Sequence, residues 1–427
     1  MGASREPWVP MGAGVQVWRV GVDHGIPRSG GKPGAIQPDE PGAWTLKAAA
    51  ASLERLAALV PAARDLGFSV WWDWGAGHPE APLGGQARWR EEPPPVWSDD
   101  AAWGQGLILT GPGGRLDELA ARWERQDPES AAALRRGLEG GRSRPEAFRA
   151  CGRWHGLNRP PYLLGILNVT RDSFYAGARH FGLDAALRRG EAIAREGGDW
   201  IEVGGESARG GTPLPAEVEA ERVAPVVAAL RSRLELPIAV DTYKPLVARA
   251  AVEAGATLIN DITGGADPEM FRVARETGAA LVLMHLSQRP KSEYQDPGYP
   301  STVDAVRWTL GERLLQAEAA GVPREQLLVD PGLNFGKHPR RDLAIMRSLR
   351  EFLALGRPVY LATSRKDYLR DLLGLPPEEL LEPTEAAVAY AILQGVQLFR
   401  IHDVAAMARV RATVWAIREA AAAARAG

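Results

Sequence analysis

Polar and charged side chains stand at the ends of several short apolar runs in this sequence. Asp241, Asn260 and Asp330 each end such a run, and together they offer hydrogen-bond donors and acceptors from three separate segments. A flat, nitrogen-rich heterocycle, with N–H donors on one edge and acceptors on another, suits such a set. Asp330 precedes a Pro-Gly pair, so its carboxylate could instead cap a turn.

A second group of candidate residues is mainly basic. Arg400 and His402 alternate with an isoleucine, so on a strand both side chains share one face and form a cationic patch suited to a phosphate. Lys366, at the predicted start of a helix, adds donors at a positive helix terminus. Asn168 offers a neutral oxygen ligand to a magnesium ion already held by phosphates. His285 has two interpretations, a catalytic histidine or a buried, hydrogen-bonded one.

The runs that end in these residues alternate with helical stretches such as 183–197, 244–255 and 383–395. Apolar strands separated by helices predict a parallel sheet buried on both faces. Eight units in about 265 residues match a (β/α)₈ TIM barrel, whose active site lies at the carboxyl ends of its strands. A doubly wound sheet is the competing architecture. The predicted strands are 162–169, 199–206, 236–242, 257–263, 280–285, 327–333, 358–364 and 398–404.

The first 155 residues differ in composition from the rest, because eleven of the 14 tryptophans precede residue 160 and proline and glycine are dense there. Strands are predicted at 15–22, 68–74 and 106–111, and helices at 43–67, 116–126 and 128–140. We therefore predict an additional smaller N-terminal α/β domain over 1–155 and a barrel over 160–427. The N-terminal part holds no chemical motif, and its role stays open. Trp71, Trp72 and Trp74 are expected in its core rather than in a ligand groove.

Composition restricts the partners and the compartment. The net charge of −2 and the lack of a long apolar run argue against nucleic-acid or membrane binding. The single cysteine, Cys151, cannot form an internal disulfide, which fits a reducing compartment. The N-terminal residues lack the apolar core of a signal peptide. We expect a cytoplasmic protein with small-molecule substrates.

Eight segments of the sequence together resemble the dihydropteroate synthase family. They are GILNVTRDSF (165–174), IEVGGESARGG (201–211), VDTYKP (240–245), INDITG (259–264), LMH (283–285), DPGLNFGKH (330–338), SRK (364–366) and RIHDV (400–404). They occur in the family's order and spacing, on all eight predicted strands. The resemblance implies a transferase of folate biosynthesis. Its substrates would be 4-aminobenzoate and a 7,8-dihydropterin that carries a hydroxymethyl pyrophosphate, and pyrophosphate would be the leaving group.

The family's motifs imply a role for each matching residue. The pterin would be held by Asp241, Asn260, Met284, Asp330 and Lys366, pyrophosphate by Asn168, Arg400 and His402, and 4-aminobenzoate by Arg209, Phe335 and Ser364. Asn168 would also bind Mg²⁺. Lys366, Arg209 and Asp241 would act in catalysis through positioning and charge stabilisation, without a covalent nucleophile. Family members are commonly dimers through barrel helices, so the resemblance also implies a homodimer.

The sequence departs from the family pattern mainly in two segments after the first two strands. Ala176 replaces an acidic residue, Ala208 a hydroxyl and Gly210 a proline, while Glu202 stands where aspartate is usual and Ala362 where glycine is usual. Each lost polar contact could weaken binding by ~1 kcal/mol or more.

Three hypotheses follow from the resemblance and its departures. The chain is an active synthase, which the complete pterin and pyrophosphate sets favour, or it is a pterin-binding paralogue that lacks synthase activity or does different pterin chemistry. A pterin-dependent methyltransferase is the third hypothesis. The SRK and RIHD segments, which suit pyrophosphate chemistry, and the lack of a visible corrinoid-binding segment argue against it.

Overall fold

The computed structural model divides the chain into two compact units. The first comprises Met1–Arg144, Gly298–Glu312 and Arg350–Gly356, and the second comprises Pro145–Pro297, Arg313–Leu349 and Arg357–Gly427. The structure describes residues 15–19, 43–50, 53–66, 68–74, 89–90, 105–142, 144–169, 179–207, 211–292, 297–299 and 301–426.

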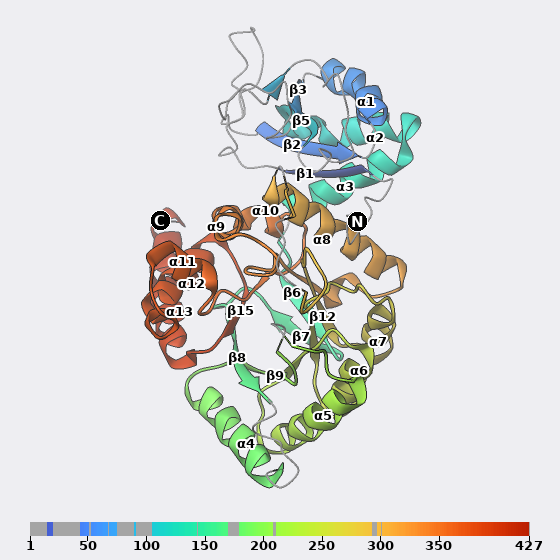
Figure 1. Cartoon of the computed structure of the whole chain (residues 1–427). Helices are drawn as coiled ribbons and strands as arrows, with labels where there is room; N and C mark the ends of the chain where they lie inside the picture. Colours follow the sequence, from blue (N-terminus) through green and yellow to red (C-terminus); the bar gives the residue numbers. More distant parts are fainter. Residues whose placement is uncertain are drawn as a thin grey trace, which may run out of the picture. The chain divides into compact units, whose positions relative to one another are not determined.

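The second unit is built around a parallel sheet of eight described strands in the order β13-β12-β11-β10-β9-β8-β15-β14. A parallel bridge between Val329 and Val359 joins the two outer strands, so the sheet curls into a barrel. Helices surround the strands, among them α4 to α7 and α11 to α13 (Figure 1). The TIM barrel predicted from the alternation of strands and helices is confirmed, and the doubly wound sheet is excluded.

The barrel strands lie within the predicted runs and end where the polar residues begin. They are β8 (Tyr162–Asn168), β9 (Trp200–Gly204), β10 (Ile238–Asp241), β11 (Leu258–Asp261), β12 (Ala280–Met284), β13 (Leu327–Asp330), β14 (Tyr360–Leu361) and β15 (Leu398–Ile401). β9 is buried at every position, because one face packs inside the barrel and the other against helices.

Helices follow these strands along the chain, and most of them have one buried face. They are α4 (Arg179–Arg195), α5 (Ala216–Arg233), α6 (Pro245–Glu253), α7 (Glu269–Thr277), α8 (Thr302–Ala319), α9 (Pro339–Arg347), α10 (Leu349–Leu353), α11 (Asp367–Leu373), α12 (Leu381–Gln394) and α13 (Val404–Ala426). In α7 the buried residues Met270, Val273 and Ala274 recur at helical spacing, and the helix ends at Gly278 with a φ of 74°. None of the described helices is long and apolar enough to cross a membrane.

A β-hairpin contributes to the core of the barrel. It consists of β6 (Ala147–Ala150) and β7 (Arg153–Gly156), which pair antiparallel. Phe148 is fully buried, stacks on His155 at 4.9 Å and lies 6.1 Å from the Trp200 ring at the start of β9. The hairpin therefore packs with the barrel, although the sequence boundary at residue 155 assigns it to the N-terminal part.

Among the described residues before 145, the first unit contains an antiparallel sheet in the order β1-β2-β5-β3-β4, together with α-helices. Its elements are β1 (Val15–Arg19), β2 (Ala43–Ala50), α1 (Leu53–Asp65), β3 (Ser69–Trp74), β4 (Trp89–Arg90), β5 (Gln105–Pro112), α2 (Leu116–Gln126) and α3 (Pro128–Arg142). Trp72 is buried in its core, as expected, whereas the side chains of Trp71 and Trp74 lie outside the described residues.

One prediction for this unit is wrong. The segment 43–67 is not a single helix, because residues 43–50 form β2 and only Leu53–Asp65 form α1. β2 pairs antiparallel with both β1 and β5, and its buried Leu46 and Ala48 alternate as on a strand. Alanine favours a helix in isolation, but pairing on both sides overrides that weak preference.

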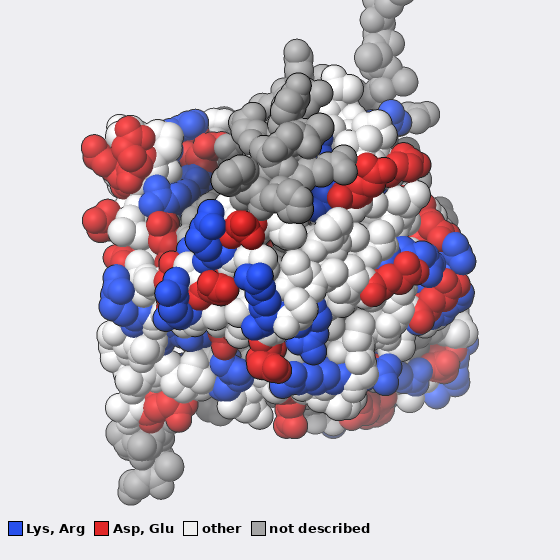
Figure 2. Space-filling model, turned by 90° about the horizontal axis from the view of Figure 1, so that it is seen from below, with Lys and Arg blue, Asp and Glu red and all other residues white. Residues whose placement is uncertain are grey.

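Lys and Arg side chains lie among Asp and Glu on the face that Figure 2 shows. The two signs alternate over short distances, and no wide area of one sign is visible among the coloured residues. This face therefore offers no basic surface of the kind that binds a nucleic-acid backbone.

Candidate active site

Side chains along a strand point alternately to opposite faces, so every second residue of a barrel strand faces the barrel interior. This alternation explains why the candidate residues lie close together. The apolar interior includes Trp200, Ala239, Leu258, Val282, Leu328 and Leu398. Two residues further along the same strands stand Glu202, Asp241, Asn260, Met284, Asp330 and Arg400, which we call the polar layer. Side chains two residues apart face the same side of a strand, so the polar layer lies above an apolar floor.

Glu202 lies at the centre of the polar layer and has no exposed surface. Its Oε1 accepts hydrogen bonds from Arg400 Nε at 2.5 Å and from Asn260 Nδ2 at 3.2 Å. Its Oε2 accepts a hydrogen bond from the hydroxyl of Tyr360, a buried residue of β14. A buried carboxylate needs a charged partner and further donors, and Glu202 has both.

Arg400 connects Glu202 with Asp241, because its Nη2 donates to Asp241 Oδ2 at 2.7 Å. Burial raises the pKa of Asp241 to about 6, although the charge of Arg400 opposes that shift. Asp241 is therefore mostly ionised at neutral pH and accepts hydrogen bonds. The guanidinium, which the sequence predicted to face a phosphate, is held between two carboxylates of the polar layer.

Asn260 presents an acceptor to the interior of the site. Its side chain is 3% exposed, and among the described residues its Oδ1 has no hydrogen-bond partner. Buried polar atoms in folded proteins are nearly always bonded, so an orphan acceptor beside charged groups indicates a place where a ligand donates. The orphan acceptor of Asn260 is therefore suited to the predicted role of this residue in binding a heterocycle.

Asp330 and Lys366 form a second part of the site. Burial raises the pKa of Asp330 to about 6, and the backbone N–H of Gly332 and the charge of Lys366 lower it in part. The Gly332 N–H lies 2.7 Å from Asp330 Oδ1, so the turn cap considered from the sequence does exist. Gly332 has a φ of 69°, and a Cβ there would meet the His285 carbonyl oxygen at 2.0 Å, so the turn requires glycine.

An apolar cluster adjoins these charged groups. Met284 is buried against Ile262 and Leu286, and the partly buried Phe335 packs on the same cluster. The Lys366 ammonium lies 4.6 Å from the centroid of the Phe335 ring, which is a cation–π contact. Met284, Phe335 and Lys366 thus border one region, and their roles toward the pterin and 4-aminobenzoate stay predictions.

The outer end of the barrel carries Asn168, His402 and Ser364, which we call the rim. Asn168 and His402 are exposed at the ends of their strands, and Gly204 leaves space between Asn168 and Asp241, since a Cβ there would lie 3.5 Å from Asn168 Oδ1. Ser364 Oγ is buried and lies 3.0 Å from His402 Nδ1.

The imidazole of His402 is neutral at the rim. Desolvation and the positive charges of Arg400 and Lys366 lower its pKa to about 4. A neutral ring can still donate one hydrogen bond to a phosphate, and a bound anion would favour its protonated form.

The loop after β13 is fixed by buried polar contacts. The Lys337 ammonium donates to the carbonyl oxygens of Gly332 at 2.7 Å and Phe335 at 3.1 Å, and burial lowers its pKa to about 8. Asn334 Nδ2 donates to Asp367 Oδ2 at 2.8 Å. These bonds hold the Phe335 loop against the segment that carries Lys366.

Four other polar residues at strand ends have structural partners. Asp261 accepts the backbone N–H groups of Thr263 and Gly265 and caps the turn after β11. Glu206 binds Lys244 at 2.6 Å and Lys291 at 2.5 Å. The side chain of Arg365 binds Asp403 at 2.7 Å.

His285 is buried, and burial lowers its pKa well below the usual value, which favours the structural interpretation over a catalytic one. Arg209, predicted to act in catalysis and to bind 4-aminobenzoate, lies outside the described residues, as do Ala176, Ala208 and Gly210.

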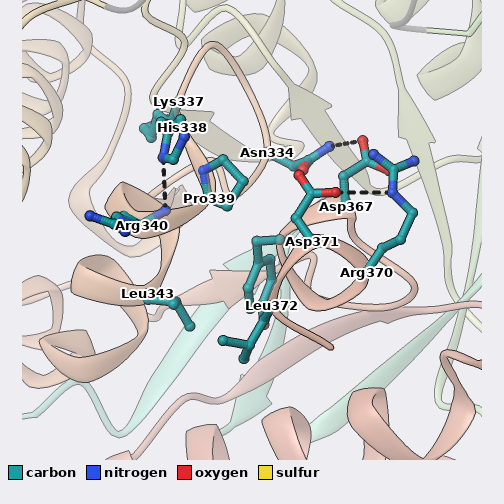
Figure 3. A pocket seen from close by; sticks show the side chains of 11 residues that line it. Asn334, Lys337, His338, Pro339, Arg340, Leu343, Asp367, Arg370, Asp371 and Leu372 are labelled. Atoms are coloured by element: carbon teal, nitrogen blue, oxygen red, sulfur yellow. Dashed lines mark hydrogen bonds and ion pairs between the residues drawn. The ribbon is translucent and has the colours of Figure 1, made fainter. Parts of the chain in front are cut away.

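A separate pocket opens between α9 and α11, with a volume of about 700 Å³ (Figure 3). Its lining includes Lys337 and Leu343 from the α9 segment and Arg370 and Leu372 from α11, while Asn334 lies beside Asp367. None of the predicted site residues lines it. Its lining includes no residue of the polar layer, so the two are distinct.

Sequence reasoning did not assign a role to Glu202 or Tyr360. Glu202 was noted only as a departure from the family pattern, yet it bonds to three other side chains of the barrel interior. A signal was present, because a glutamate inside an otherwise apolar strand must be paired when it is buried. Its partners could not be found in this way, since they lie on other strands.

The fold and the buried polar layer define a TIM-barrel enzyme with its site at the carboxyl ends of the strands. The family model described as pterin binding enzyme matches residues 164–402, and the chain belongs to this family.

Its relatives include dihydropteroate synthases. That of Bacillus subtilis is 42% identical over 250 residues, which cover 58% of this chain and 85% of the relative. The solved structure of Xanthomonas albilineans dihydropteroate synthase with 4-aminobenzoic acid is 37% identical, with a TM-score of 0.59 over 64% of this chain and 98% of that one. Inactive dihydropteroate synthase 2 of Mycobacterium leprae is 39% identical over 274 residues, or 63% of this chain and 94% of that relative.

Proposed function

We propose that this chain is a dihydropteroate synthase, which joins 6-hydroxymethyl-7,8-dihydropterin pyrophosphate to 4-aminobenzoate and releases pyrophosphate. The observation that carries this proposal is the buried polar layer, in which the orphan acceptor of Asn260 lies beside Asp241 and Arg400 on strands of a pterin binding enzyme. Its relatives in Bacillus subtilis and Xanthomonas albilineans support the proposal.

Asp241, Asn260 and Asp330 would recognise the pterin. Their oxygens accept from the ring N–H and amino groups, while Lys366 donates to an acceptor on the ring. Met284 packs on the face of the ring system. The carboxylates are costly to bury, as their raised pKa values indicate, so donors on the substrate stabilise their ionised forms.

The reaction needs no covalent enzyme intermediate. The aryl nitrogen forms a bond to the methylene carbon, the bond from that carbon to the pyrophosphate oxygen breaks, and pyrophosphate leaves with the electron pair. The nitrogen then loses a proton to solvent. Arg400 and His402 would stabilise the leaving charge, while Lys366 holds the pterin in line, so catalysis is positioning and electrostatic stabilisation.

Asn168 fits a magnesium ion that arrives with the substrate. Among the described residues, no group of three His, Cys, Asp or Glu side chains could hold a metal alone. The exposed Asn168 supplies one amide oxygen at an open strand end, and Mg²⁺ takes most of its ligands from phosphates and water in such sites. The bound ion would neutralise part of the pyrophosphate charge.

The 4-aminobenzoate would bind beside Phe335 and Ser364, with Arg209 facing its carboxylate. Phe335 lies next to Lys366, which places an aromatic face near the reacting end of the pterin. We also propose that the residues before the β6–β7 hairpin, rather than all of residues 1–155, form the smaller α/β domain predicted from the sequence.

A homodimer through α11 and α12 is a further part of this proposal. Leu372, Leu373 and Leu393 are more than half exposed, and Tyr390 is 40% exposed. Exposed large apolar side chains on these two successive helices suit burial against a second copy. Sedimentation should give a dimer, and Leu393→Arg should give a monomer.

Synthase activity is tested with the purified chain, the pterin pyrophosphate, Mg²⁺ and labelled 4-aminobenzoate. We expect labelled dihydropteroate and an equal amount of pyrophosphate. Pterin binding without pyrophosphate release would contradict the synthase and support the paralogue, a candidate favoured by the 39% identity to the inactive Mycobacterium leprae relative.

A further inference from the structure

The carboxylate of Glu202 determines which way the amide of Asn260 faces. Its Oε1 lies 3.2 Å from Asn260 Nδ2, and its charge is paired with Arg400 Nε at 2.5 Å. An ionised carboxylate only accepts hydrogen bonds, so it binds the NH₂ group of the amide. The flipped amide would bring two oxygens together without a hydrogen between them.

Asn260 Oδ1 must therefore point away from Glu202. That atom is buried and has no partner among the described residues. Tyr360 strengthens the same arrangement, because its hydroxyl donates to the other oxygen of Glu202 and lies 3.4 Å from Asn260 Nδ2. An isolated Asn260 could present either its oxygen or its NH₂ to a ligand, whereas this one presents the oxygen.

We propose that Glu202 is a positioning residue, which fixes Asn260 as a hydrogen-bond acceptor toward the pterin and holds Arg400 beside Asp241. The inference rests on the proposed function, because it assigns a donor on the bound pterin to Asn260 Oδ1. It explains why a fully buried acid lies in the barrel although it does not itself face the ligand.

Glu202→Gln tests this role with little change in size. The glutamine can donate to Asn260 Oδ1, which frees the amide to flip and removes the acceptor from the ligand. We expect the Kd of 7,8-dihydropterin, measured by calorimetry without pyrophosphate, to rise about tenfold to hundredfold. The Michaelis constant for the aminobenzoate substrate should change less than about twofold, because that substrate lies elsewhere in the site.

Glu219→Gln is the matched control. Glu219 is also a buried acid, with an ion pair to Lys244 at 2.6 Å, but it lies outside the polar layer. Its loss should lower thermal stability and leave the dihydropterin Kd within about twofold. A Glu202→Gln protein with the wild-type Kd would overturn the inference.

A double variant that exchanges the charges of residues 202 and 260 tests whether Glu202 orients Asn260 or only supports the fold. In Glu202→Gln with Asn260→Asp, the new carboxylate accepts from Gln and still offers its second oxygen to the pterin. We expect dihydropterin to bind at least about tenfold more tightly to this double variant than to Glu202→Gln. Equal affinities would overturn the inference.

If Glu202→Gln does not fold, the double variant still provides a test, because it keeps the net charge of the wild-type chain. It is then compared with Asn260→Asp alone. That single variant sets two carboxylates side by side and should bind about tenfold more weakly than the double variant, whereas equal binding would overturn the inference. A wild-type chain that does not bind dihydropterin would contradict the proposed function instead.

Discussion

The polar layer and the rim belong to one site but are built differently. In the polar layer, Glu202, Asp241 and Arg400 are joined by ion pairs inside the barrel before any ligand arrives. At the rim, Asn168 and His402 are exposed, and the described contact of the His402 ring is to a serine hydroxyl. If the chain acts as proposed, the barrel would preorganise pterin recognition, while the phosphate groups would meet side chains that gain partners on binding.

The largest effect should follow from removing a charge in the polar layer. Asp241→Asn removes one of the two carboxylates that hold Arg400 and the acceptor that we propose for the pterin, so kcat/KM should fall about 1000-fold. Asp261→Asn is the control, because this buried acid caps a turn outside the polar layer. It should lower the Tm and leave kcat/KM within about threefold. Similar kcat/KM losses for the two variants would contradict the distinction between the polar layer and a buried acid outside it.

Arg400→Lys tests whether one side chain serves both regions. Lysine cannot reach Glu202 and Asp241 with a planar fork, so kcat/KM should fall about 100-fold. Affinity for the pterin pyrophosphate should fall more than affinity for dihydropterin alone, because Arg400 would also stabilise the phosphates in the proposed function. Equal losses for the two ligands would assign Arg400 to the polar layer only.

Some features of the polar layer could be predicted from the sequence, and others could not. Alternation along a strand predicts that Asp241 and Arg400 face the barrel interior, because it needs only local periodicity. The bond from Arg400 to Glu202 joins residues 198 positions apart, and that from Asn260 to Glu202 spans 58. Such pairs depend on barrel closure, as the strand Ala43–Ala50 depends on β5, so neither could be predicted from local pattern.

A change of pH should have opposite effects on the affinities for dihydropterin and for pyrophosphate, each by about tenfold per pH unit. Asp241 and Asp330 have pKa values of about 6 and bind donors when ionised, so dihydropterin affinity should fall as the pH falls below 6. His402 has a pKa of about 4, and bound pyrophosphate raises it, so pyrophosphate affinity should increase as the pH falls from 7 to 5.

Calorimetry across this pH range measures both affinities. His402→Gln corrects for the titration of pyrophosphate itself and should flatten the second trend. Parallel pH profiles for dihydropterin and pyrophosphate would contradict a distinction between the polar layer and the rim.

The smallest effect concerns Ala176 and Ala208, two departures from the family pattern that the resemblance assigns to the 4-aminobenzoate site. Ala208→Thr with Ala176→Asp restores the polar groups usual in the family, so the Michaelis constant for the aminobenzoate substrate should fall about threefold. Dihydropterin affinity should stay the same, because the polar layer is unchanged. Unchanged steady-state kinetics would mean that this chain holds 4-aminobenzoate without those groups.

A crystal structure of the chain with dihydropterin, pyrophosphate and Mg²⁺ tests the central claim most directly. We predict the pterin edge against Asp241, Asn260 Oδ1 and Asp330, with pyrophosphate between Asn168 and His402. A pterin bound in the pocket between α9 and α11 (Figure 3), with the polar layer empty, would contradict the account.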